Sequence, residues 1–245
     1  MVNIKINGIE YAVEEGTTIL EACRQNGIRI PTLCWLKDIN AIGACRICVV
    51  EMTGARSLVA SCVYPLSKFD EGKNILTHSP AVLQSRKMTL QLLLSNHNMD
   101  CLACSRNGSC ELQELCKELG VDDTTFFEGE KNEYDIDYSS KHMFRDNNKC
   151  IHCRRCIAAC DKLQGIGVIG ANNRGFKTSI DCAFDLDLAE TACVSCGQCI
   201  VACPTGALAE KDDTDKVWDA LADPEKVVVV QTAPAVRASL GEAFG

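Results

Sequence analysis

This sequence lacks the features that mark several large classes of protein. Its longest aliphatic run, Val227–Val230, is far too short to span a bilayer. The N-terminus has no basic segment followed by a long apolar stretch, as a secretory signal would have. Acidic residues outnumber basic ones by 33 to 25, whereas a nucleic-acid-binding protein is expected to present a basic face. We therefore expect a cytoplasmic protein whose partners are protein subunits or small redox proteins.

Cysteine is the exception to an otherwise ordinary composition, with 18 in 245 residues. So many cysteines indicate either a disulfide framework or metal sites. Disulfide-dense scaffolds are usually short and secreted, whereas clustered cysteines in a reducing compartment more often bind metal. Most of the cysteines fall in three groups, at 34–62, 101–110 and 150–203, and residues 122–149 have the polar composition of a loop or linker. We therefore expect tandem metal-binding modules.

The first segment carries strong local signals. Val2–Ile6 and Ile9–Val13 flank Asn7-Gly8, a pair that suits the type I′ turn of a β-hairpin. Thr18 and Glu21 have the spacing of a capping box and predict the start of a helix. A hairpin, a helix and then a cysteine-bearing loop indicate a small α+β domain.

The strongest metal signal is a run of four cysteines, C-x2-C-x2-C-x3-C, that occurs twice. This is the spacing of two-cluster bacterial ferredoxins, in which three thiolates hold one 4Fe-4S cube and the fourth crosses to the other. Zinc, the alternative, is typically bound by two C-x2-C pairs and has no use for three cysteines in a row. The first predicted ligand set is Cys150, Cys153, Cys156 and Cys203, and the second is Cys160, Cys193, Cys196 and Cys199.

A different pattern, C-x10-C-x2-C-x13-C, comprises Cys34, Cys45, Cys48 and Cys62. Four cysteines in a loop-rich region suit a 2Fe-2S cluster, although the spacing differs from the plant-type ferredoxin pattern. A structural zinc site is the alternative. The small residues Gly43-Ala44 would let backbone N–H groups approach the sulfurs, which tunes a cluster's potential.

The third pattern combines a histidine with three cysteines: His97, Cys101, Cys104 and Cys110. A helix that begins at Ser79-Pro80 is expected to deliver the chain to His97. Three cysteines and one histidine also suit structural zinc, and Cys116 competes for the fourth position. An imidazole in place of a thiolate removes negative charge and raises the potential of a cluster.

Other features support blander interpretations. Residues 165–170 match G-x-G-x-x-G, but they follow a stretch expected to be helical, whereas a dinucleotide fingerprint follows a strand. A glycine-rich turn is the favoured interpretation. Three cysteines stay outside the ligand sets, and we expect Cys23, Cys116 and Cys182 to be packed thiols.

The order of these patterns resembles the N-terminal half of FeFe-hydrogenases. The first two modules also look like the large iron–sulfur subunit of respiratory complex I and the NAD-linked formate dehydrogenase α subunit. The resemblance covers nearly the whole chain. It implies that the N-terminal cysteines bind 2Fe-2S in a β-grasp domain, and that His97 is a true ligand of a 4Fe-4S cluster.

Residues 227–245 look like the opening of the hydrogenase catalytic domain, most similar to the NAD(P)-linked, multisubunit, electron-bifurcating type. By composition this segment predicts a short buried strand and then a helix. The cysteines that hold the hydrogen-activating cluster in that family are not within residues 1–245, so no residue here is assigned a catalytic role.

We therefore expect an α+β chain of tandem iron–sulfur modules. They are a β-grasp 2Fe-2S domain (1–79), a helical histidine-ligated 4Fe-4S domain (80–121), a linker (122–140), a two-cluster 4Fe-4S ferredoxin-like domain (141–213) and the strand–helix start of a hydrogenase-type catalytic domain (214–245). The cofactors expected are one 2Fe-2S and three 4Fe-4S clusters.

The resemblance implies an electron relay of an NAD(P)-linked FeFe-hydrogenase. Single electrons would pass between a flavin-bearing NAD(P)H-oxidising subunit or ferredoxin and the hydrogen-activating domain, with a small 2Fe-2S subunit as a further partner. The two ferredoxin-type clusters, which come last in the chain, are expected to lie nearest that domain. The alternatives are the same relay in a formate dehydrogenase or nickel–iron hydrogenase complex, a stand-alone ferredoxin-like carrier, and a zinc-stabilised interaction protein.

Overall fold

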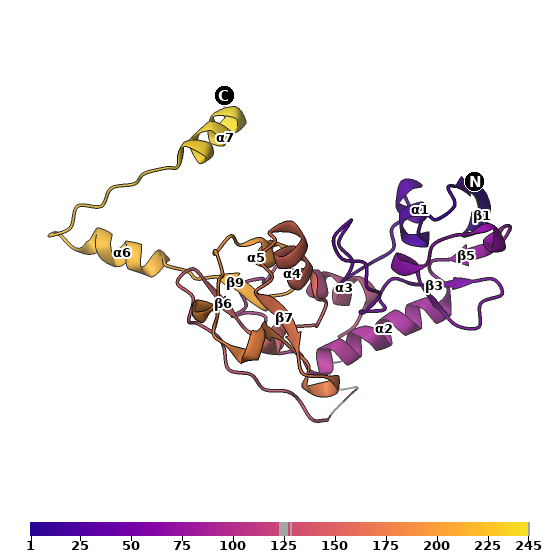
Figure 1. Cartoon of the computed structure of the whole chain (residues 1–245), viewed down its shortest axis with the longest axis horizontal. Helices are drawn as coiled ribbons and strands as arrows, with labels where there is room; N and C mark the ends of the chain where they lie inside the picture. Colours follow the sequence, from indigo (N-terminus) through magenta and orange to yellow (C-terminus); the bar gives the residue numbers. More distant parts are fainter. Residues whose placement is uncertain (123–126, 128, 245) are drawn as a thin grey trace. The chain divides into compact units, whose positions relative to one another are not determined.

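The computed structural model describes residues 1–122, 127 and 129–244, and it divides the chain into two units, 1–210 and 211–245 (Figure 1). Residues 123–126 and 128, part of the predicted linker, lie outside the described residues, as does Gly245. None of the described helices combines the length and apolar composition needed to cross a membrane. The mixed α+β class expected from the sequence is confirmed.

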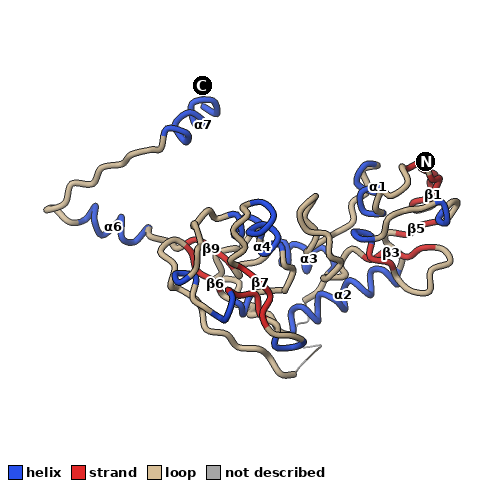
Figure 2. The backbone as a smooth tube through the Cα atoms, in the orientation of Figure 1, coloured by secondary structure: helices blue, strands red, loops and turns tan. Residues whose placement is uncertain are grey.

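A five-stranded sheet forms the N-terminal part of the first unit, in the order β2-β1-β5-β3-β4. Figure 2 labels its three central strands, β1, β5 and β3. β1 and β5 run parallel, and the other neighbouring strands are antiparallel. One helix, α1, packs its apolar residues into the core of this sheet. The elements are β1 (Val2–Ile6), β2 (Ile9–Val13), α1 (Ile19–Gln25), β3 (Val49–Met52), β4 (Val59–Ala60) and β5 (Asn74–Leu76).

The predicted hairpin and helix cap are confirmed. Asn7 and Gly8 connect β1 to β2 with φ of 51° and 88°, the left-handed backbone that a type I′ turn requires. The Thr18 hydroxyl accepts the Glu21 N–H at 3.2 Å, and the Glu21 carboxylate accepts the Thr18 N–H at 3.4 Å. This reciprocal cap fixes the start of α1 and so its orientation on the sheet.

Two helices follow the sheet: α2 (Pro80–Ser95) and α3 (Glu111–Leu119). Ser79 caps α2 as predicted, because its hydroxyl accepts the Val82 N–H at 3.3 Å. α3 ends at Gly120, whose φ of 59° is the left-handed conformation common after a helix. The cysteines predicted to accompany His97 lie on the connection between the two helices.

The two cysteine runs sit between the strands of a small sheet. Strand β6 precedes the first run and pairs antiparallel with β9, which follows the second. The insertion between the runs forms a second hairpin, β7 with β8, and Gly165 to Gly170 lead into β7 rather than a helix. A dinucleotide loop would require the reverse arrangement. The elements are β6 (Met143–Arg145), α4 (Arg155–Ala158), a π-helical turn (Ala159–Leu163), β7 (Ile169–Asn172), β8 (Ser179–Cys182), α5 (Gln198–Ala202) and β9 (Leu208–Glu210).

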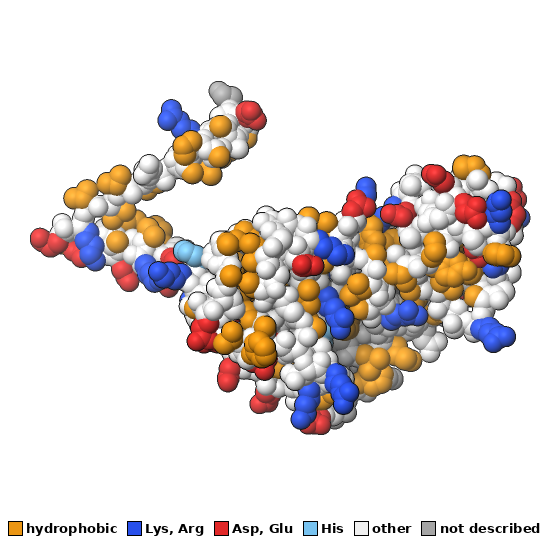
Figure 3. Space-filling model, viewed as in Figure 1, with side chains coloured by type: hydrophobic (Ala, Val, Ile, Leu, Met, Phe, Trp, Pro, Cys, Tyr) orange, Lys and Arg blue, Asp and Glu red, His pale blue; other side chains and the backbone are white. Residues whose placement is uncertain are grey.

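The second unit contains two helices, α6 (Thr214–Ala222) and α7 (Pro234–Phe244). The helix predicted near the C-terminus is present as α7, but the buried strand predicted before it is wrong. Val227–Val230 pairs with no strand in the described chain, and Val227 is 91% exposed. A strand is stable only beside a hydrogen-bonded neighbour, and this unit supplies none among its described residues. Hydrophobic side chains line the visible faces of both helices (Figure 3), and Trp218 is 65% exposed.

Candidate metal centres

The N-terminal site gathers the four cysteines predicted for a 2Fe-2S cluster. All four are buried, and the Sγ atoms of Cys48 and Cys62 are 3.3 Å apart. Hydrogen bonding among the thiols lowers the pKa of Cys34 and of Cys48, and raises that of Cys45 and of Cys62. Four buried thiols that share protons in this way form a donor set suited to a thiophilic metal group.

Backbone amides support the sulfurs of this site, as the small residues there predicted. The Cys45 N–H donates to the Cys34 Sγ at 3.5 Å, and Gly43 just before it has a φ of 62°. A side chain at Gly43 would press on Val63, since a Cβ there would lie 3.0 Å from a Val63 methyl group. The absence of a side chain at Gly43 therefore lets this turn pack closely on Val63, next to the predicted ligand Cys62.

Arg86 on α2 ties this site to the neighbouring helix. The side chain is 1% exposed, and its Nε and Nη2 donate to the carbonyls of Ile47 and Val49 at 3.0 and 2.9 Å. These two residues flank Cys48. Burial lowers the pKa of Arg86 to about 10, which still leaves it charged at neutral pH. Arg86 thus holds the strand end that carries a predicted ligand.

The site around His97 contains a cavity of about 340 Å³. Its lining includes the four predicted ligands and also Cys116, the competitor for the fourth position. The His97 Nδ1 atom is buried without a hydrogen-bond partner. Burial, reinforced by the Lys149 cation, lowers the pKa of His97 to about 4, so the imidazole is neutral at neutral pH. Neutral imidazole is the form that binds metal.

Two other features shape the same cavity. Cys110 caps α3, and although burial raises its pKa, the N–H groups of Gln113 and Leu112 oppose that rise. Gly206 lies against Cys104, and a Cβ on this glycine would overlap the Cys104 sulfur. The absence of a side chain at Gly206 therefore lets the segment after Cys203 approach the site closely.

The first cysteine run shares its cavity with a cysteine from the end of the second. Cys150, Cys153, Cys156 and Cys203 all line one small cavity. Burial raises the pKa of Cys153 to about 12, and the His152 N–H donates to the Cys150 Sγ at 3.4 Å. Thiols in such surroundings become thiolates only beside a compensating positive charge, such as a metal.

The second run lies around another small cavity together with the last cysteine of the first run. The cysteines of this lining are Cys160, Cys193, Cys196 and Cys199. Burial raises the pKa of Cys199 to about 12, whereas Cys196 is exposed. Each cavity is thus lined by three cysteines of one run and the fourth cysteine of the other run, as the spacing predicts.

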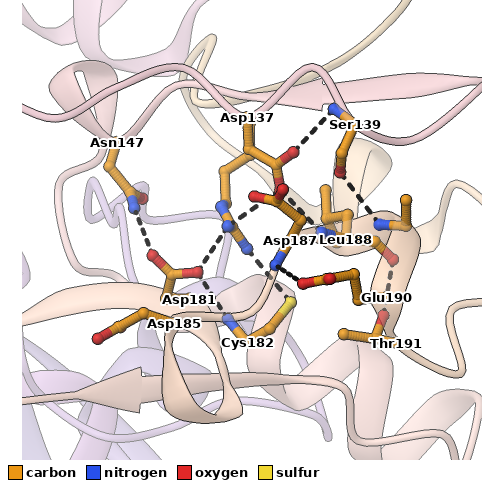
Figure 4. A network of polar contacts seen from close by, with 12 residues as sticks. Asp137, Ser139, Asn147, Asp181, Cys182, Asp185, Asp187, Leu188, Glu190 and Thr191 are labelled. Atoms are coloured by element: carbon orange, nitrogen blue, oxygen red, sulfur yellow. Dashed lines mark hydrogen bonds and ion pairs between the residues drawn. The ribbon is translucent and has the colours of Figure 1, made fainter.

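Arg145 lines the first of these two cavities. Its guanidinium contacts Asp137, Asp181 and Cys182, three of the residues labelled in the polar network of Figure 4. Its Nη2 contacts Asp137 at 3.1 Å and Asp181 at 2.5 Å, and its Nη1 donates to the Cys182 Sγ at 3.4 Å. Burial raises the pKa of Asp181, and Arg145 partly offsets this rise. Burial also raises the pKa of Cys150, again opposed by the Arg145 charge. The network places one fixed cation near one ligand set.

Two of the three spare cysteines are buried, as expected. Cys23 lies in the core beneath the sheet, where burial raises its pKa to about 11. Cys182 packs inside the insertion and accepts a hydrogen bond from Arg145. Cys116 differs from the expectation of a simple packed thiol, because it is only partly buried and faces the His97 cavity.

The donor sets differ in their fit to a single metal ion and to a polynuclear cluster. A single ion needs at least three ligands that converge on one point, and no such histidine, cysteine or carboxylate group occurs among the described residues. The predicted ligands instead lie as sets of four, rich in sulfur and largely buried, one of them with an unpartnered imidazole nitrogen. Such sets fit polynuclear iron–sulfur groups, which need thiolates spread around a larger body.

The sets are also connected to each other through the protein. Arg106, between the predicted ligands of the His97 site, donates to the carbonyls of Ile200 and Cys203 at 2.7 and 3.2 Å. The Glu111 N–H donates to the Pro204 carbonyl at 3.0 Å. The end of the second cysteine run therefore packs directly on the His97 site.

Sequence reasoning missed several residues that shape these sites. Arg86 carried a readable signal, because it interrupts an apolar row at four-residue spacing on α2 whose other members are Val82, Leu90 and Leu94. A charged residue in such a row is buried only with partners. Gly206 and Arg145 gave no comparable signal, since their roles depend on contacts made across the fold.

Three family models match separate parts of the chain. A 2Fe-2S iron–sulfur cluster binding domain matches residues 1–79. An NADH-ubiquinone oxidoreductase-G iron–sulfur binding region matches residues 86–125, and a 4Fe-4S dicluster domain matches residues 149–207. The chain therefore contains both 2Fe-2S and 4Fe-4S binding domains.

Individual relatives extend these matches. The chain is 45% identical to the NADP-reducing hydrogenase subunit HndD of Solidesulfovibrio fructosivorans and 39% identical to iron hydrogenase 1 of Clostridium pasteurianum. Both matches cover 100% of this chain and 42% of the relative, so the chain spans less than half of their length. Its fold also matches a chain of an NAD+-reducing [NiFe]-hydrogenase crystal structure, with a TM-score of 0.78 and 28% identity, over 86% of this chain and 87% of that one.

Proposed function

We propose, on the premise that this chain is homologous to the N-terminal iron–sulfur region of iron hydrogenases and of the large complex I iron–sulfur subunit, that it is an electron relay. When bound, one 2Fe-2S and three 4Fe-4S clusters supply one-electron redox chemistry. The observation that carries the proposal is the grouping of each ferredoxin-type cysteine run with the fourth cysteine of the other run.

The assignment of the two ferredoxin-type ligand sets follows this grouping. The other two sets follow the sequence patterns around Cys34–Cys62 and His97–Cys110. The 2Fe-2S ligands are Cys34, Cys45, Cys48 and Cys62. The 4Fe-4S ligands are His97, Cys101, Cys104 and Cys110 for one cluster, Cys150, Cys153, Cys156 and Cys203 for the second, and Cys160, Cys193, Cys196 and Cys199 for the third.

His97 is preferred to Cys116 as the fourth ligand of its site. Its Nδ1 is a buried polar atom without a partner, and such atoms are costly unless a ligand or metal satisfies the ring. Burial raises the pKa of Cys116 to about 11, as it raises those of the assigned ligands Cys153 and Cys199, so the preference rests on the unpartnered imidazole. A neutral imidazole is ready to bind metal without losing a proton.

The other residues of the chain tune and shield the clusters. The Cys45 and His152 amides donate to ligand sulfurs, which stabilises the reduced, more negative state of a cluster. Burial of the N-terminal thiols excludes water, whereas the exposed Cys196 leaves the third 4Fe-4S site open at the surface. This gradient of exposure is what a relay with buried and surface stations requires.

The proposed context is an NAD(P)-linked, electron-bifurcating FeFe-hydrogenase complex. The two hydrogenase relatives match the whole chain, which favours this context. Electrons would come from a flavin-bearing NAD(P)H-oxidising subunit, a small 2Fe-2S subunit or ferredoxin. They would leave through the two ferredoxin-type clusters toward a hydrogen-activating domain. The same relay in a nickel–iron hydrogenase is the second candidate, because this chain covers 87% of a chain in such an enzyme.

Anaerobically prepared protein tests the relay directly. We expect about fourteen irons per chain with matching acid-labile sulfide, and four reducible centres in electron paramagnetic resonance (EPR) spectra. If the protein contains zinc in place of iron, or shows no reducible centres in its EPR spectra, the relay is refuted and a structural metal site is supported.

Paired variants test the fourth ligand of the His97 site. His97→Ala should alter or abolish the EPR signal of one 4Fe-4S cluster, and Cys116→Ala should leave it intact. The reverse result would make Cys116 the ligand.

Mass spectrometry and subunit analysis of the native complex separate the two contexts. A polypeptide that carries both this relay and a hydrogen-activating domain supports the FeFe context, whereas co-purification with nickel–iron subunits supports the other. A protein that purifies alone at about 27 kDa would contradict both and favour a stand-alone carrier.

A further inference from the structure

The side chain of Asn40 contacts the main chain at two predicted ligands from different sites. Asn40 closes a short loop in which the Leu36 and Asn40 N–H groups each donate to the other residue's carbonyl at 2.9 Å. The residue is 3% exposed, and its Nδ2 donates to the Cys34 carbonyl at 2.8 Å and to the Cys153 carbonyl at 3.1 Å. Cys34 belongs to the proposed 2Fe-2S set and Cys153 to a proposed 4Fe-4S set.

Asparagine suits this position for a chemical reason. Its amide NH2 carries two donors, and both are used, on carbonyls of residues 6 and 113 positions away from Asn40. A leucine of similar shape has no donor, and an aspartate would bring a charge toward two carbonyl oxygens. A buried carbonyl that loses its donor is left unsatisfied at a cost in stability, so the position selects for the amide.

The two cysteines whose carbonyls Asn40 joins lie in one apolar cluster of the core. Leu33, Ile47 and Ile151 belong to the same buried cluster as Cys34 and Cys153. In such a cluster the hydrogen bonds fix the distance between two backbones that apolar contacts alone would leave free to slide. The Asn40 Nδ2 atom alone joins the Cys34 carbonyl to the Cys153 carbonyl by hydrogen bonds.

We propose that Asn40 is a positioning residue that holds Cys34 against Cys153, so that the 2Fe-2S cluster exchanges electrons directly with the Cys150–Cys203 cluster. The proposal rests on the proposed function. In each transfer the 2Fe-2S cluster loses one electron and the 4Fe-4S cluster gains it, and no bond or proton moves. The His97 site contacts a ligand segment of the same 4Fe-4S set through different residues, Arg106 and Pro204.

The chain contains a matched control for Asn40. Lys162 donates to the Ile39 carbonyl at 2.7 Å, so it also joins the 36–40 loop to the cysteine-run module. That bond is exposed, and neither Ile39 nor Lys162 is a predicted ligand. A loss of general contact between the modules should therefore appear in both variants, and a loss of the specific link only in Asn40 variants.

The test compares full-length, cluster-loaded wild type, Asn40→Leu, Asn40→Ser and Lys162→Met. Iron content is measured first, and then the spin relaxation of the reduced 2Fe-2S centre with the 4Fe-4S centres oxidised and reduced. We expect faster relaxation when the neighbouring cluster is reduced, a loss of this enhancement in both Asn40 variants, and no change in Lys162→Met. An unchanged enhancement in the Asn40 variants at full iron content overturns the proposal.

His97→Ala supplies an independent arm in which Asn40 is intact. The enhancement should persist when the His97 cluster is removed, and its disappearance at full occupancy of the other sites would also overturn the proposal. If an Asn40→Leu protein fails to load its clusters, the smaller Asn40→Ser substitution and the His97 arm still decide. A wild type without iron contradicts the proposed function itself, whereas full iron with no Asn40 effect contradicts only this inference.

Discussion

The two cysteine runs have the same spacing and nearly the same backbone, but different surroundings. His152 and Ser195, each two residues after the first cysteine of its run, have φ of 52° and 54°. Arg154 and Gly197, each next to the second cysteine, have φ of 60° and 73°. A short helix starts directly after these positions in both runs. The internal repeat seen in the sequence is therefore a repeat of backbone conformation.

The surroundings separate the two sites. Cys153, Cys156 and Cys203 are buried, and protein from both neighbouring modules contacts their backbone. In the other set Cys196 is exposed, and so is Val201 on α5. Spacing thus determines which cysteines group together, and the neighbouring protein determines how exposed each group is. We call the site lined by Cys150, Cys153, Cys156 and Cys203 the central site, and the site lined by Cys160, Cys193, Cys196 and Cys199 the peripheral site. The effect of a substitution in one run can therefore be compared with that of the matching substitution in the other run.

The largest effect is expected from removal of the crossing cysteines. Cys203→Ser should remove about four irons from the central site and abolish the relaxation enhancement of the 2Fe-2S centre. Cys160→Ser should remove about four irons from the peripheral site and leave the enhancement intact. Iron analysis and EPR check both. If the two variants exchange their effects, the fourth cysteines do not cross between the runs.

The next comparison concerns the position three residues after the last cysteine of each run. This position is Gly206 in the second run and Leu163 in the first. Gly206 lies against the Cys104 sulfur, whereas its counterpart Leu163 is 49% exposed. Gly206→Ala should displace Cys104 and lower iron by about four per chain through loss of the His97 cluster. Leu163→Ala should keep every cluster signal. If the EPR spectrum of the His97 site is unchanged in Gly206→Ala, the Cys104 side chain can move aside and still bind the cluster.

Arg145 distinguishes the two halves electrostatically, because it lines only the central cavity among the two ferredoxin-type sites. Arg145→Met leaves the partly buried carboxylates of Asp137 and Asp181 without their cation and should reduce the free energy of unfolding by about 3–5 kcal/mol. The lost charge should also lower the potential of the central cluster and spare the peripheral one. Anaerobic denaturant titration and redox-monitored EPR check these effects.

Lys177→Met is the control for Arg145, since it removes an exposed cation from the same insertion. Its stability and both potentials should match those of the wild type. Equal shifts of both clusters in Arg145→Met would show that its charge acts over the whole module rather than on one site.

Local signals in the sequence predicted much of the fold. Asn7-Gly8 fixed the hairpin, and Thr18 with Glu21 fixed a helix start, because turn and cap chemistry depends on adjacent residues. The cysteine spacings predicted which cysteines line each of the two small cavities, including the exchange of Cys160 and Cys203 between the runs. Such a pattern encodes a loop that wraps a metal group, so it can be read without the rest of the chain.

Contacts across the fold could not be predicted in the same way. Asn40 and Arg106 reach carbonyls more than ninety residues away, and nothing near them in the sequence marks those partners. The strand predicted at Val227–Val230 failed for a related reason. Aliphatic composition expresses a preference for a pleated, half-buried surface, but a strand also needs a neighbour.

The smallest expected effect concerns the left-handed position that the two runs share. Arg154 occupies it in the first run with φ of 60°, and Gly197 in the second with φ of 73°. A side chain in this conformation costs about 1–2 kcal/mol, and the greater freedom of unfolded glycine offsets about 0.4–1 kcal/mol of any gain. Arg154→Gly should therefore raise the free energy of unfolding by about 1 kcal/mol, and Gly197→Ala should lower it by a similar amount. Denaturant titration of the cluster-loaded variants measures both changes. Opposite signs would mean that the Arg154 side chain, exposed beside the central cavity, stabilises the protein by more than its backbone strain costs.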